Sequence, residues 1–421
     1  MRVTSTAVGT PTIRAETVRV VNRLTARWAG TAGVLGTEGG VLSATGVWPL
    51  LAFLADGADG PARDELEDAL GMRADQAAEA ARGLLGALGA IRGSASAVGL
   101  WTRPELALHE RWVTGLPEAA LGRFSGDDRA DQEALDLWAS ERTGGLIPAM
   151  PVVVNEDTKL ILATAQAVRT RWLQPFWDRE MAPEYGPWAG RSLIGLRRDT
   201  SLLDRVGVAQ TASGPLTVLK VLGDTGVDVH LLLGEEETEP GAVLKAGIDV
   251  LSGTCRTVPG DLLPLGEPGP GLNVRNVRSY DRAPTLSVTT SPFSLTAHHD
   301  LLRFRELFGL TTALDSRRGH FPGISDAPLA LADARQSAMA RFDAEGFEAA
   351  AVSAIGAVGA GIAPRPAYVA RRIGLYFDRP FGFLTVHRTS RLVLTAGWVA
   401  EPVDYVFEED EEYEEYEEED A

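Results

Sequence analysis

The side chains that could perform catalytic chemistry are few, and they lie far apart in the sequence. The chain has six histidines and one cysteine, and none of them belongs to an HExxH pair, a zinc-type set or a GxSxG elbow. Adjacent side chains in the cluster His298-His299-Asp300 point to different sides of any regular element, which favours the start of a helix over a metal site. We therefore expect no enzyme, no metal and no cofactor.

Patterns that bind nucleotides or nucleic acids are also missing or incomplete. No Walker A sequence occurs, and the glycines of 356–361 (GAVGAG) are followed by Ile-Ala-Pro-Arg-Pro, which cannot form a phosphate-facing helix. The formal charge is −18, but residues 404–421 carry 12 acidic and no basic residues, so the rest of the chain carries only −6. No basic stripe appears, and we expect no nucleic-acid partner.

The last residues form a low-complexity acidic run, EEDEEYEEYEEED over 408–420. Such a run repels itself and buries nothing apolar, so we expect 404–421 to be a disordered tail. Two roles remain open for it. It is either a solvated segment that aids solubility, or an electrostatic contact for a basic surface, on a partner or on this protein's own body.

Features that direct a chain to a membrane or to secretion are absent from the expected places. The first 30 residues lack the apolar centre of a secretory signal, and no apolar run approaches the roughly 18 residues of a membrane span. A single cysteine, Cys255, excludes an intrachain disulfide. We expect a cytoplasmic protein without membrane contact, with an extracellular location as the alternative.

One stretch differs from the rest of the chain, FDAEGFEAAAVSAIGAVGAG over 342–361. Alanine, serine and glycine bury little apolar area, at about 25 cal/mol per Å², so this run is a poor core element. It predicts an exposed loop. An alanine-rich helix is the alternative, because Glu-Ala-Ala-Ala has high helix propensity.

Helical spacing dominates the first third of the chain, and strand patterns dominate the remainder. Predicted helices cover 12–30, 47–57, 61–70 and 74–88, with a short one over 299–310. Strands are predicted over 96–102, 160–172, 216–222, 227–233, 285–289, 329–332, 337–342, 373–377, 381–387 and 392–399. This order favours an α+β fold over alternating βαβ units.

Six short motifs, in the same order and at similar spacing, resemble those of the serpin family. They are WASERTGGLIP (138–148), RTRWLQPF (169–176), FPGIS (321–325), DAEGFEAAAVS (343–353), FDRPFGFL (377–384) and GWVAEP (397–402). The fourth is similar to the family's hinge, and the fifth to its signature FNRPFLFLI. Each motif alone is weak, but six in order indicate a serpin, of the bacterial type.

The resemblance implies a single serpin domain over 1–403, with three β-sheets, eight or nine helices and an exposed reactive loop at about 344–372. It also implies a metastable monomer that inhibits a serine protease once per molecule. The protease cuts the loop and forms an acyl-enzyme, and the loop inserts into the central sheet, sheet A. The alternative is a non-inhibitory serpin-fold binding protein whose loop inserts slowly or not at all.

An inserted loop becomes a strand, whose side chains alternate between core and surface. Counted from Gly346, inward positions begin at Phe347, where the family has a small residue, so the ring should slow insertion. Phe347→Thr is therefore expected to accelerate trapping. The hinge implied by the resemblance comprises Glu345, Gly346, Phe347, Glu348, Ala349, Ala350, Ala351, Val352 and Ser353.

In the serpin family the hinge glycine is the fifteenth residue before the cut bond. If Gly346 is that glycine, the resemblance implies a cut at Ala360-Gly361, with Gly359 and Arg365 as alternatives. A small residue at the cut suits a shallow primary pocket, since a deep charged pocket gains little from a methyl group. The resemblance therefore implies an elastase- or subtilisin-like protease as the partner.

The polar cluster that the family uses beneath its central sheet is matched here only by Ser43. Gly39, Gly46, Thr164 and Gln336 stand at the other corresponding positions, so a different network should control opening of the sheet. Trp172 is counted with this sheet-opening region and is expected to be a packed core or gate aromatic, not a ligand-binding one.

Overall fold

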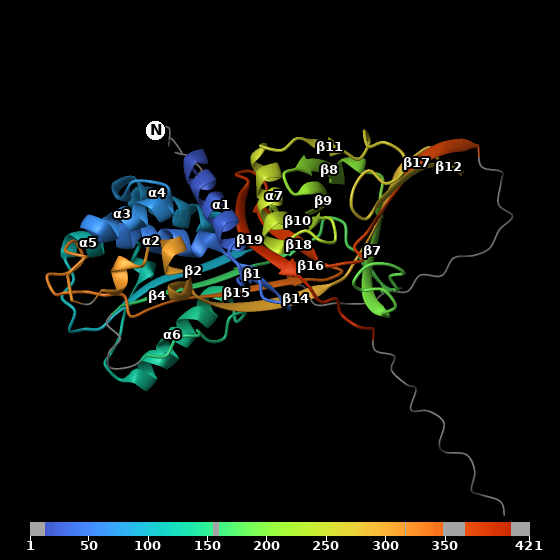
Figure 1. The fold of residues 1–421 in the computed structure, drawn as a ribbon. Helices are drawn as coiled ribbons and strands as arrows, with labels where there is room; N and C mark the ends of the chain where they lie inside the picture. The colour runs from blue at the N-terminus through green and yellow to red at the C-terminus, as the bar shows by residue number, and fades with distance from the viewer. Residues whose placement is uncertain (1–12, 155–159, 316, 348–366, 406–421) are drawn as a thin grey trace, which may run out of the picture.

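The computed structural model describes residues 13–154, 160–315, 317–347 and 367–405. Within them the chain forms eight α-helices and three β-sheets, which confirms the expected α+β class. The helices gather around one half of the molecule, while strands make up most of the other half (Figure 1). No helix in these ranges is long and apolar enough to cross a membrane.

The helices of the first third form where their spacing and end residues predict them. Asp59 accepts a hydrogen bond from the Gly60 nitrogen at the start of α3, and Gly71 ends this helix at φ 64°. The α-helices are α1 (Ala15–Ala29), α2 (Ala44–Gly57), α3 (Gly60–Leu70), α4 (Ala74–Ala90), α5 (Glu110–Gly115), α6 (Asp128–Thr143), α7 (Pro240–Ser252) and α8 (Arg305–Phe308). Short 3-10 helices cover Glu118–Ala120, Leu203–Arg205, Leu301–Phe304 and Thr312–Leu314.

The first sheet, here called the core sheet, has the order β1-β19-β18-β10-β9-β8-β11. Every residue of β19 is buried, which explains its continuous apolar sequence. The strands are β1 (Gly39–Leu42), β8 (Val206–Thr211), β9 (Gly214–Leu222), β10 (Val227–Leu233), β11 (Thr257–Pro259), β18 (Phe381–His387) and β19 (Leu392–Val399).

The second sheet, here called the β4–β15 sheet, has the order β3-β2-β4-β15-β16-β5, with β14 paired to β15. Helix α6 covers one face of it, and α2 and α4 lie on the other (Figure 1). The strands are β2 (Ser94–Thr102), β3 (Leu121–Arg123), β4 (Leu160–Val168), β5 (Thr170–Arg171), β14 (Phe293–Asp300), β15 (Asp333–Phe342) and β16 (Gly346–Phe347).

The third sheet has five strands in the order β12-β17-β13-β7-β6. Its inner face is apolar, and Leu286 and Val288 of β13 are fully buried. The strands are β6 (Trp177–Met181), β7 (Leu193–Thr200), β12 (Leu272–Ser279), β13 (Thr285–Thr290) and β17 (Tyr368–Tyr376).

Two sequence predictions are wrong in the described residues. Residues 329–332 form no strand, because β15 begins only at Asp333. His298 and His299 lie on β14 and not at a helix start, since the predicted helix over 299–310 is reduced to a 3-10 turn and the four residues of α8. Asp300 does cap that turn, accepting from the Leu302 nitrogen at 2.9 Å.

Two boundaries also differ from those expected. Strands β16 and β17 include both ends of the loop expected at about 344–372, because β16 covers Gly346–Phe347 and β17 begins at Tyr368; residues 348–366 lie outside the described residues. Asp404 and Tyr405, which the sequence assigns to the acidic tail, pair instead with Leu193 and Ser192 at the start of β7.

Candidate functional site

The turn between β15 and β16 is built around the carboxylate of Asp343. Its Oδ1 accepts hydrogen bonds from the backbone nitrogens of Glu345 and Gly346, both at 3.0 Å. The Asp343 nitrogen donates to the Gly346 carbonyl, also at 3.0 Å. An aspartate that binds the backbone two and three residues ahead fixes a tight reversal, so the chain turns back into the sheet here.

A second segment, which follows β5, holds this turn from outside. Trp172 donates from its ring nitrogen to the Asp343 carbonyl at 3.0 Å and from its backbone nitrogen to the Glu345 carbonyl at 2.9 Å. Phe176 donates from its backbone nitrogen to the Ala344 carbonyl at 2.7 Å. Three consecutive carbonyls of the turn are therefore satisfied by one short segment.

Phe347 lies between two strands of the β4–β15 sheet. It pairs with Phe342 of β15 on one side and with Thr170 of β5 on the other. Its side chain is fully buried, and its ring centroid lies 6.5 Å from that of Phe293 and 6.2 Å from that of Phe383. The ring is thus already seated in the core, so the sequence argument that it must be squeezed in during insertion does not hold.

Beyond β16 the sheet closes, because β4 and β15 pair directly. Six residues of β15, 333–338, run parallel to residues 161–166 of β4. Parallel ladders are slightly less stable per residue than antiparallel ones. A strand that continued from β16 would have to separate β4 from β15 and lie between them, along this β4–β15 seam.

Ser43 and Gln336 meet beneath the seam through two hydrogen bonds. The Ser43 nitrogen donates to Gln336 Oε1 at 2.9 Å, and Gln336 Nε2 donates to the Ser43 carbonyl at 2.7 Å. Ser43 Oγ also donates to the Leu394 carbonyl at 2.7 Å. The side chain of Gln336 on β15 thus links the seam to Ser43, which precedes α2. Ser43 in turn links it to β19 through the Leu394 carbonyl.

Thr164 lies directly opposite Gln336 in the register of the seam. Its hydroxyl is buried and has no hydrogen-bond partner in the part of the chain that the structure describes. A Cβ atom at residue 46 would lie 2.0 Å from Thr164 Oγ1, so only glycine fits there beside this threonine. Gly39 plays no part in this contact; it lies on β1 and pairs with Val399 of β19.

His299 completes this polar row, although the sequence argument missed it. It pairs with Gln336 from the other neighbouring strand, and its Nε2 lies 2.8 Å from the Val41 carbonyl oxygen. Burial lowers the pKa of His299, against the opposing effect of the Val41 hydrogen bond. The alternation of Phe293, Leu295, Ala297 and His299 along β14 is the strand pattern that could have found it.

The remaining predicted site residues lie outside the described residues. They are Glu348, Ala349, Ala350, Ala351, Val352, Ser353, Gly359, Ala360, Gly361 and Arg365. Among the described ranges, no three His, Cys, Asp or Glu side chains gather as metal ligands. Ser43, Thr164 and Gln336 thus form a buried polar cluster at the β4–β15 seam, and Trp172 binds the turn between β15 and β16.

Comparison with known proteins identifies the family. The sequence profile described as "Serpin (serine protease inhibitor)" matches residues 31–185 and 274–402. A stretch of 82 residues is 39% identical to serpin-Z6C of Oryza sativa subsp. japonica, which is 19% of either chain. This match spans about a fifth of the length of that curated relative.

Solved structures resemble the fold at low sequence identity. The native state of the thermophilic serpin tengpin matches with a TM-score of 0.71 and 14% identity, over 93% of this chain and 95% of that one. Human thyroxine-binding globulin, solved with thyroxine, matches with a TM-score of 0.67 and 14% identity, over 93% and 99%. The profile covers well over half of the sequence, and the fold of solved serpins matches 93% of it, so the chain belongs to the serpin family.

Proposed function

We propose that this protein inhibits a serine protease by inserting its cleaved loop into the β4–β15 sheet, the counterpart of the family's sheet A. The observation that carries the proposal is β16, which already occupies the upper end of the seam, between β15 and β5. The residues after Phe347 would extend this strand between β4 and β15, from Phe347 toward the Asp333 end of β15. About 14 residues at ~3.3 Å each span roughly 45 Å, enough to move a bound protease along the whole sheet.

The chemistry of the trap is ordinary acyl transfer. The protease serine hydroxyl attacks the carbonyl of Ala360, the bond to Gly361 breaks, and the amine of Gly361 leaves with the proton. The ester that forms keeps the protease attached while the loop inserts. Gly359 and Arg365 remain the alternative positions for the cut.

The proposal extends to the partner and the setting. We propose an elastase- or subtilisin-like target, a bacterial-type serpin domain over 1–403, and a monomer. The small residue proposed at the cut bond supports the choice of target. We keep the cytoplasm as the expected compartment and the extracellular space as the alternative, which fractionation of the source cells distinguishes.

Incubation with a panel of serine proteases tests the inhibitor proposal. We expect a protease–inhibitor complex that survives denaturing electrophoresis. Mass spectrometry should show that the released carboxyl-terminal fragment begins at Gly361. A protease whose serine is chemically blocked serves as control and should give no complex. Clean loop cleavage by every enzyme, with full protease activity retained, would contradict the proposal.

A second candidate, a non-inhibitory binding protein, is favoured by a different observation. A cavity of about 710 Å³ lies between α1 and α7, lined by Val18, Asn22, Ile248, Leu251 and Arg391. Thyroxine-binding globulin, which has a similar fold, holds thyroxine in its solved structure. A small amphipathic ligand in this cavity would suit a serpin-fold carrier.

Melting before and after nicking of the loop separates the two candidates. Insertion adds a strand to the sheet, so an inhibitor should melt at a much higher temperature once nicked. An unchanged melting temperature would support the binding protein. Nicked and intact samples must be compared at equal concentration and salt.

A further inference from the structure

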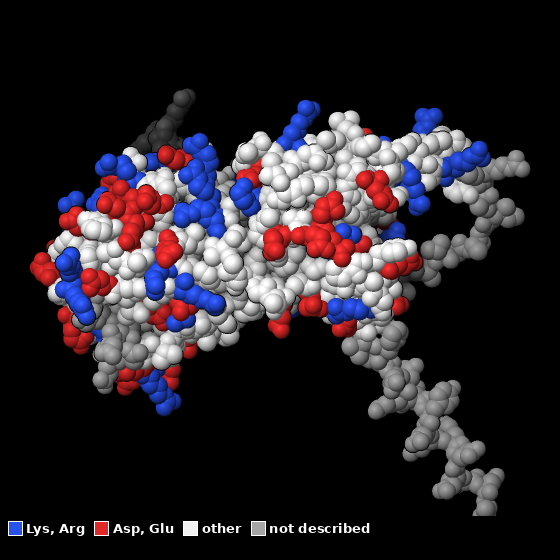
Figure 2. All heavy atoms as spheres, viewed as in Figure 1, with Lys and Arg blue, Asp and Glu red and all other residues white. Residues whose placement is uncertain are grey.

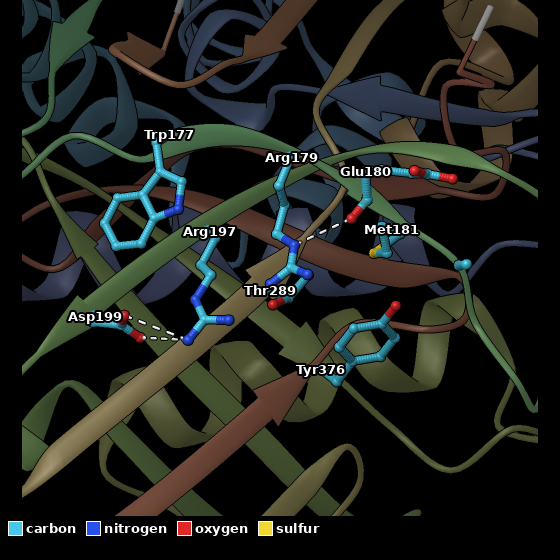
Figure 3. Close-up of a pocket in the computed structure, with 9 residues that line it drawn as sticks. Trp177, Arg179, Glu180, Met181, Arg197, Asp199, Thr289 and Tyr376 are labelled. Carbon is cyan, nitrogen blue, oxygen red and sulfur yellow. Dashed lines mark hydrogen bonds and ion pairs between the residues drawn. The ribbon is translucent and has the colours of Figure 1, made fainter. Parts of the chain in front are cut away.

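The outer face of the five-stranded sheet carries a hollow of about 900 Å³. Trp177 and Arg179 of β6, Arg197 of β7 and Tyr376 of β17 line it, with Thr289 between them (Figure 3). Trp177 pairs with Arg197, Arg197 with Thr289, and Thr289 with Tyr376, so these side chains share one face. The exposed fraction of Trp177 is 46%, which is high for so large a ring.

The hollow is lined by two arginines and two carboxylates, but neither arginine is held by a short ion pair. Arg179 is exposed and has no ion pair with a described carboxylate; its Nε donates to the Glu180 carbonyl. Arg197 lies 3.4 Å from Asp199, longer than a normal charge-assisted hydrogen bond. Glu180, the other acid that lines the hollow, already accepts from Ser192 Oγ at 2.7 Å.

Two more arginines continue the row on the same face. Arg372 lies four residues before Tyr376 on β17 and pairs with Arg275 of β12. Arg275 is exposed, and the hydrogen bonds of Arg372 go to neutral oxygens of Ser279, Ala283 and Thr285. Figure 2 shows basic side chains at the end of the molecule that carries β12 and β17. Arg179, Arg197, Arg275 and Arg372 are here called the arginine face.

The described chain ends beside this face. Asp404 pairs with Leu193, and the Tyr405 nitrogen donates to the Ser192 carbonyl at 2.9 Å. Arg191 holds the same segment through ion pairs with Asp404 at 2.9 Å and Glu401 at 3.0 Å. From Ser192 to Arg197 is about 17 Å along β7, while the 16 residues 406–421 extend to roughly 50 Å. The acidic tail can therefore reach the whole arginine face.

We propose that the acidic tail, residues 406–421, binds across the arginine face of its own chain. It carries 11 carboxylates and no cation, and the face presents four arginines against Asp199 and Glu180, with Asp378 and Glu184 close enough to Tyr376 to affect it. Attachment beside β7 gives the tail a high effective concentration, so even weak pairs are occupied. Tyr413 and Tyr416 supply rings for the exposed surface of Trp177.

The net charge of the body does not oppose this contact. Residues 1–403 carry −6 in total, but charges beyond a Debye length of about 8–10 Å are screened in physiological salt, so the local arginines decide. The inference is independent of protease inhibition, because it needs only the tail and the sheet.

Time-resolved fluorescence anisotropy of the full chain tests the proposal. A dye on Ala421→Cys, in a Cys255→Ser background, should show a large slow component, because the bound tail tumbles with the body. We expect Arg179→Gln with Arg197→Gln to reduce the amplitude of that component at least threefold, and 0.5 M NaCl to do the same to the parent. Arg129→Gln with Arg142→Gln, on exposed parts of α6, is the matched control and should leave it unchanged.

A tail variant protects the test against a folding failure of the sheet variant. The tail variant carries glutamine in place of Glu411, Glu412 and Glu414, which removes charge without changing any described contact. It should reduce the amplitude of the slow component to a similar extent. Equal amplitudes in the parent and both test variants, or an equal loss in the α6 control, would overturn the proposal. A slow component that depends on protein concentration, with dimers seen by light scattering, would show that the tail binds a second copy and would overturn it as well.

Discussion

Phe347 anchors β16 through a ring that is fully buried against Phe293 and Phe383. Removing a buried phenylalanine ring leaves a cavity and costs about 3–5 kcal/mol. We predict that Phe347→Ala lowers the free energy of unfolding of the uncut protein by about this amount, measured by denaturant unfolding. Tyr280→Ala, at an exposed aromatic residue, is the control and should change it little.

The same burial changes the expectation for trapping. Because the ring is seated before any cleavage, its entry is not part of the insertion step, and Phe347→Thr should alter the rate of complex formation by no more than about twofold. The measurement is the second-order rate of complex formation with a protease that the parent traps. A many-fold acceleration would restore the view that the ring is the obstacle.

Thr164 is the second residue with a specific expectation. Its buried hydroxyl lacks a partner among the described residues, and an unsatisfied buried polar group costs about 1–3 kcal/mol. Thr164→Val keeps the shape and should raise the free energy of unfolding by roughly 1 kcal/mol. Thr395→Val is the control, because that hydroxyl is bonded to Thr385 Oγ1 at 2.7 Å, and it should destabilise. Destabilisation by Thr164→Val would indicate a bound water.

At the scale of elements, Trp172 joins the segment after β5 to the β15–β16 turn. Its ring nitrogen bonds the Asp343 carbonyl, and its ring lies 4.9 Å from Phe342. Trp172→Phe keeps most of the packing but removes the hydrogen bond, so we predict a loss of about 1–2 kcal/mol and faster hydrogen exchange of the Glu345 and Gly346 amides. Trp138→Phe on α6 should leave those amides unchanged.

Gln336 connects β15 with the segment that starts α2. Gln336→Ala would leave the buried Ser43 nitrogen without its partner and remove a second bond from the Ser43 carbonyl. We predict a loss of roughly 2–4 kcal/mol in thermal or denaturant unfolding, together with easier opening of the seam. Gln210→Ala, at an exposed position of β8, is the control. Equal melting of the two variants would show that this link does not hold the seam.

At the scale of the molecule, three histidines make stability depend on pH. Burial lowers the pKa values of His299 and His387, and it lowers that of His230 to about 4. Below about pH 6.5 the unfolded chain binds protons that the folded chain does not, so stability should fall as pH falls from 6.5 to 5. Denaturant unfolding across this window checks the sign. His299→Gln should reduce the slope.

The sequence predicted the element types well where local periodicity is strong. The helices at 15–29, 44–57 and 60–70 and the strands at 381–387 and 392–399 follow directly from spacing and end residues. Helix α7 was not predicted from the sequence, and Gly247 within it lowers its helix propensity. Gly247 is needed there, since a Cβ atom would lie 2.3 Å from Leu232 Cδ1 of β10. Propensity disfavoured this helix, and close packing against a strand outweighed it.

The candidate site was predictable only in part. The hinge motif and Trp172 stay predictions, which the sequence offered because the family resemblance lies in short contiguous runs. His299 was missed because its neighbours in sequence resemble a helix start, and the arginine face was missed because β6, β7 and β12 contribute to it from distant segments. Polar strands with one exposed face give a weak periodic pattern, so these three strands were not predicted.

By itself, the sequence determined the α+β class, the order of its elements, the family resemblance and the small-residue run that begins after Gly346. Only the tertiary structure decided that Phe347 is already seated, and that Ser43, Thr164, His299 and Gln336 meet beneath one seam. The physical reason is range. Element type depends on side chains a few residues apart, whereas these contacts join residues that lie from a few tens to nearly three hundred positions apart, and strand pairing in the folded sheets brings them together.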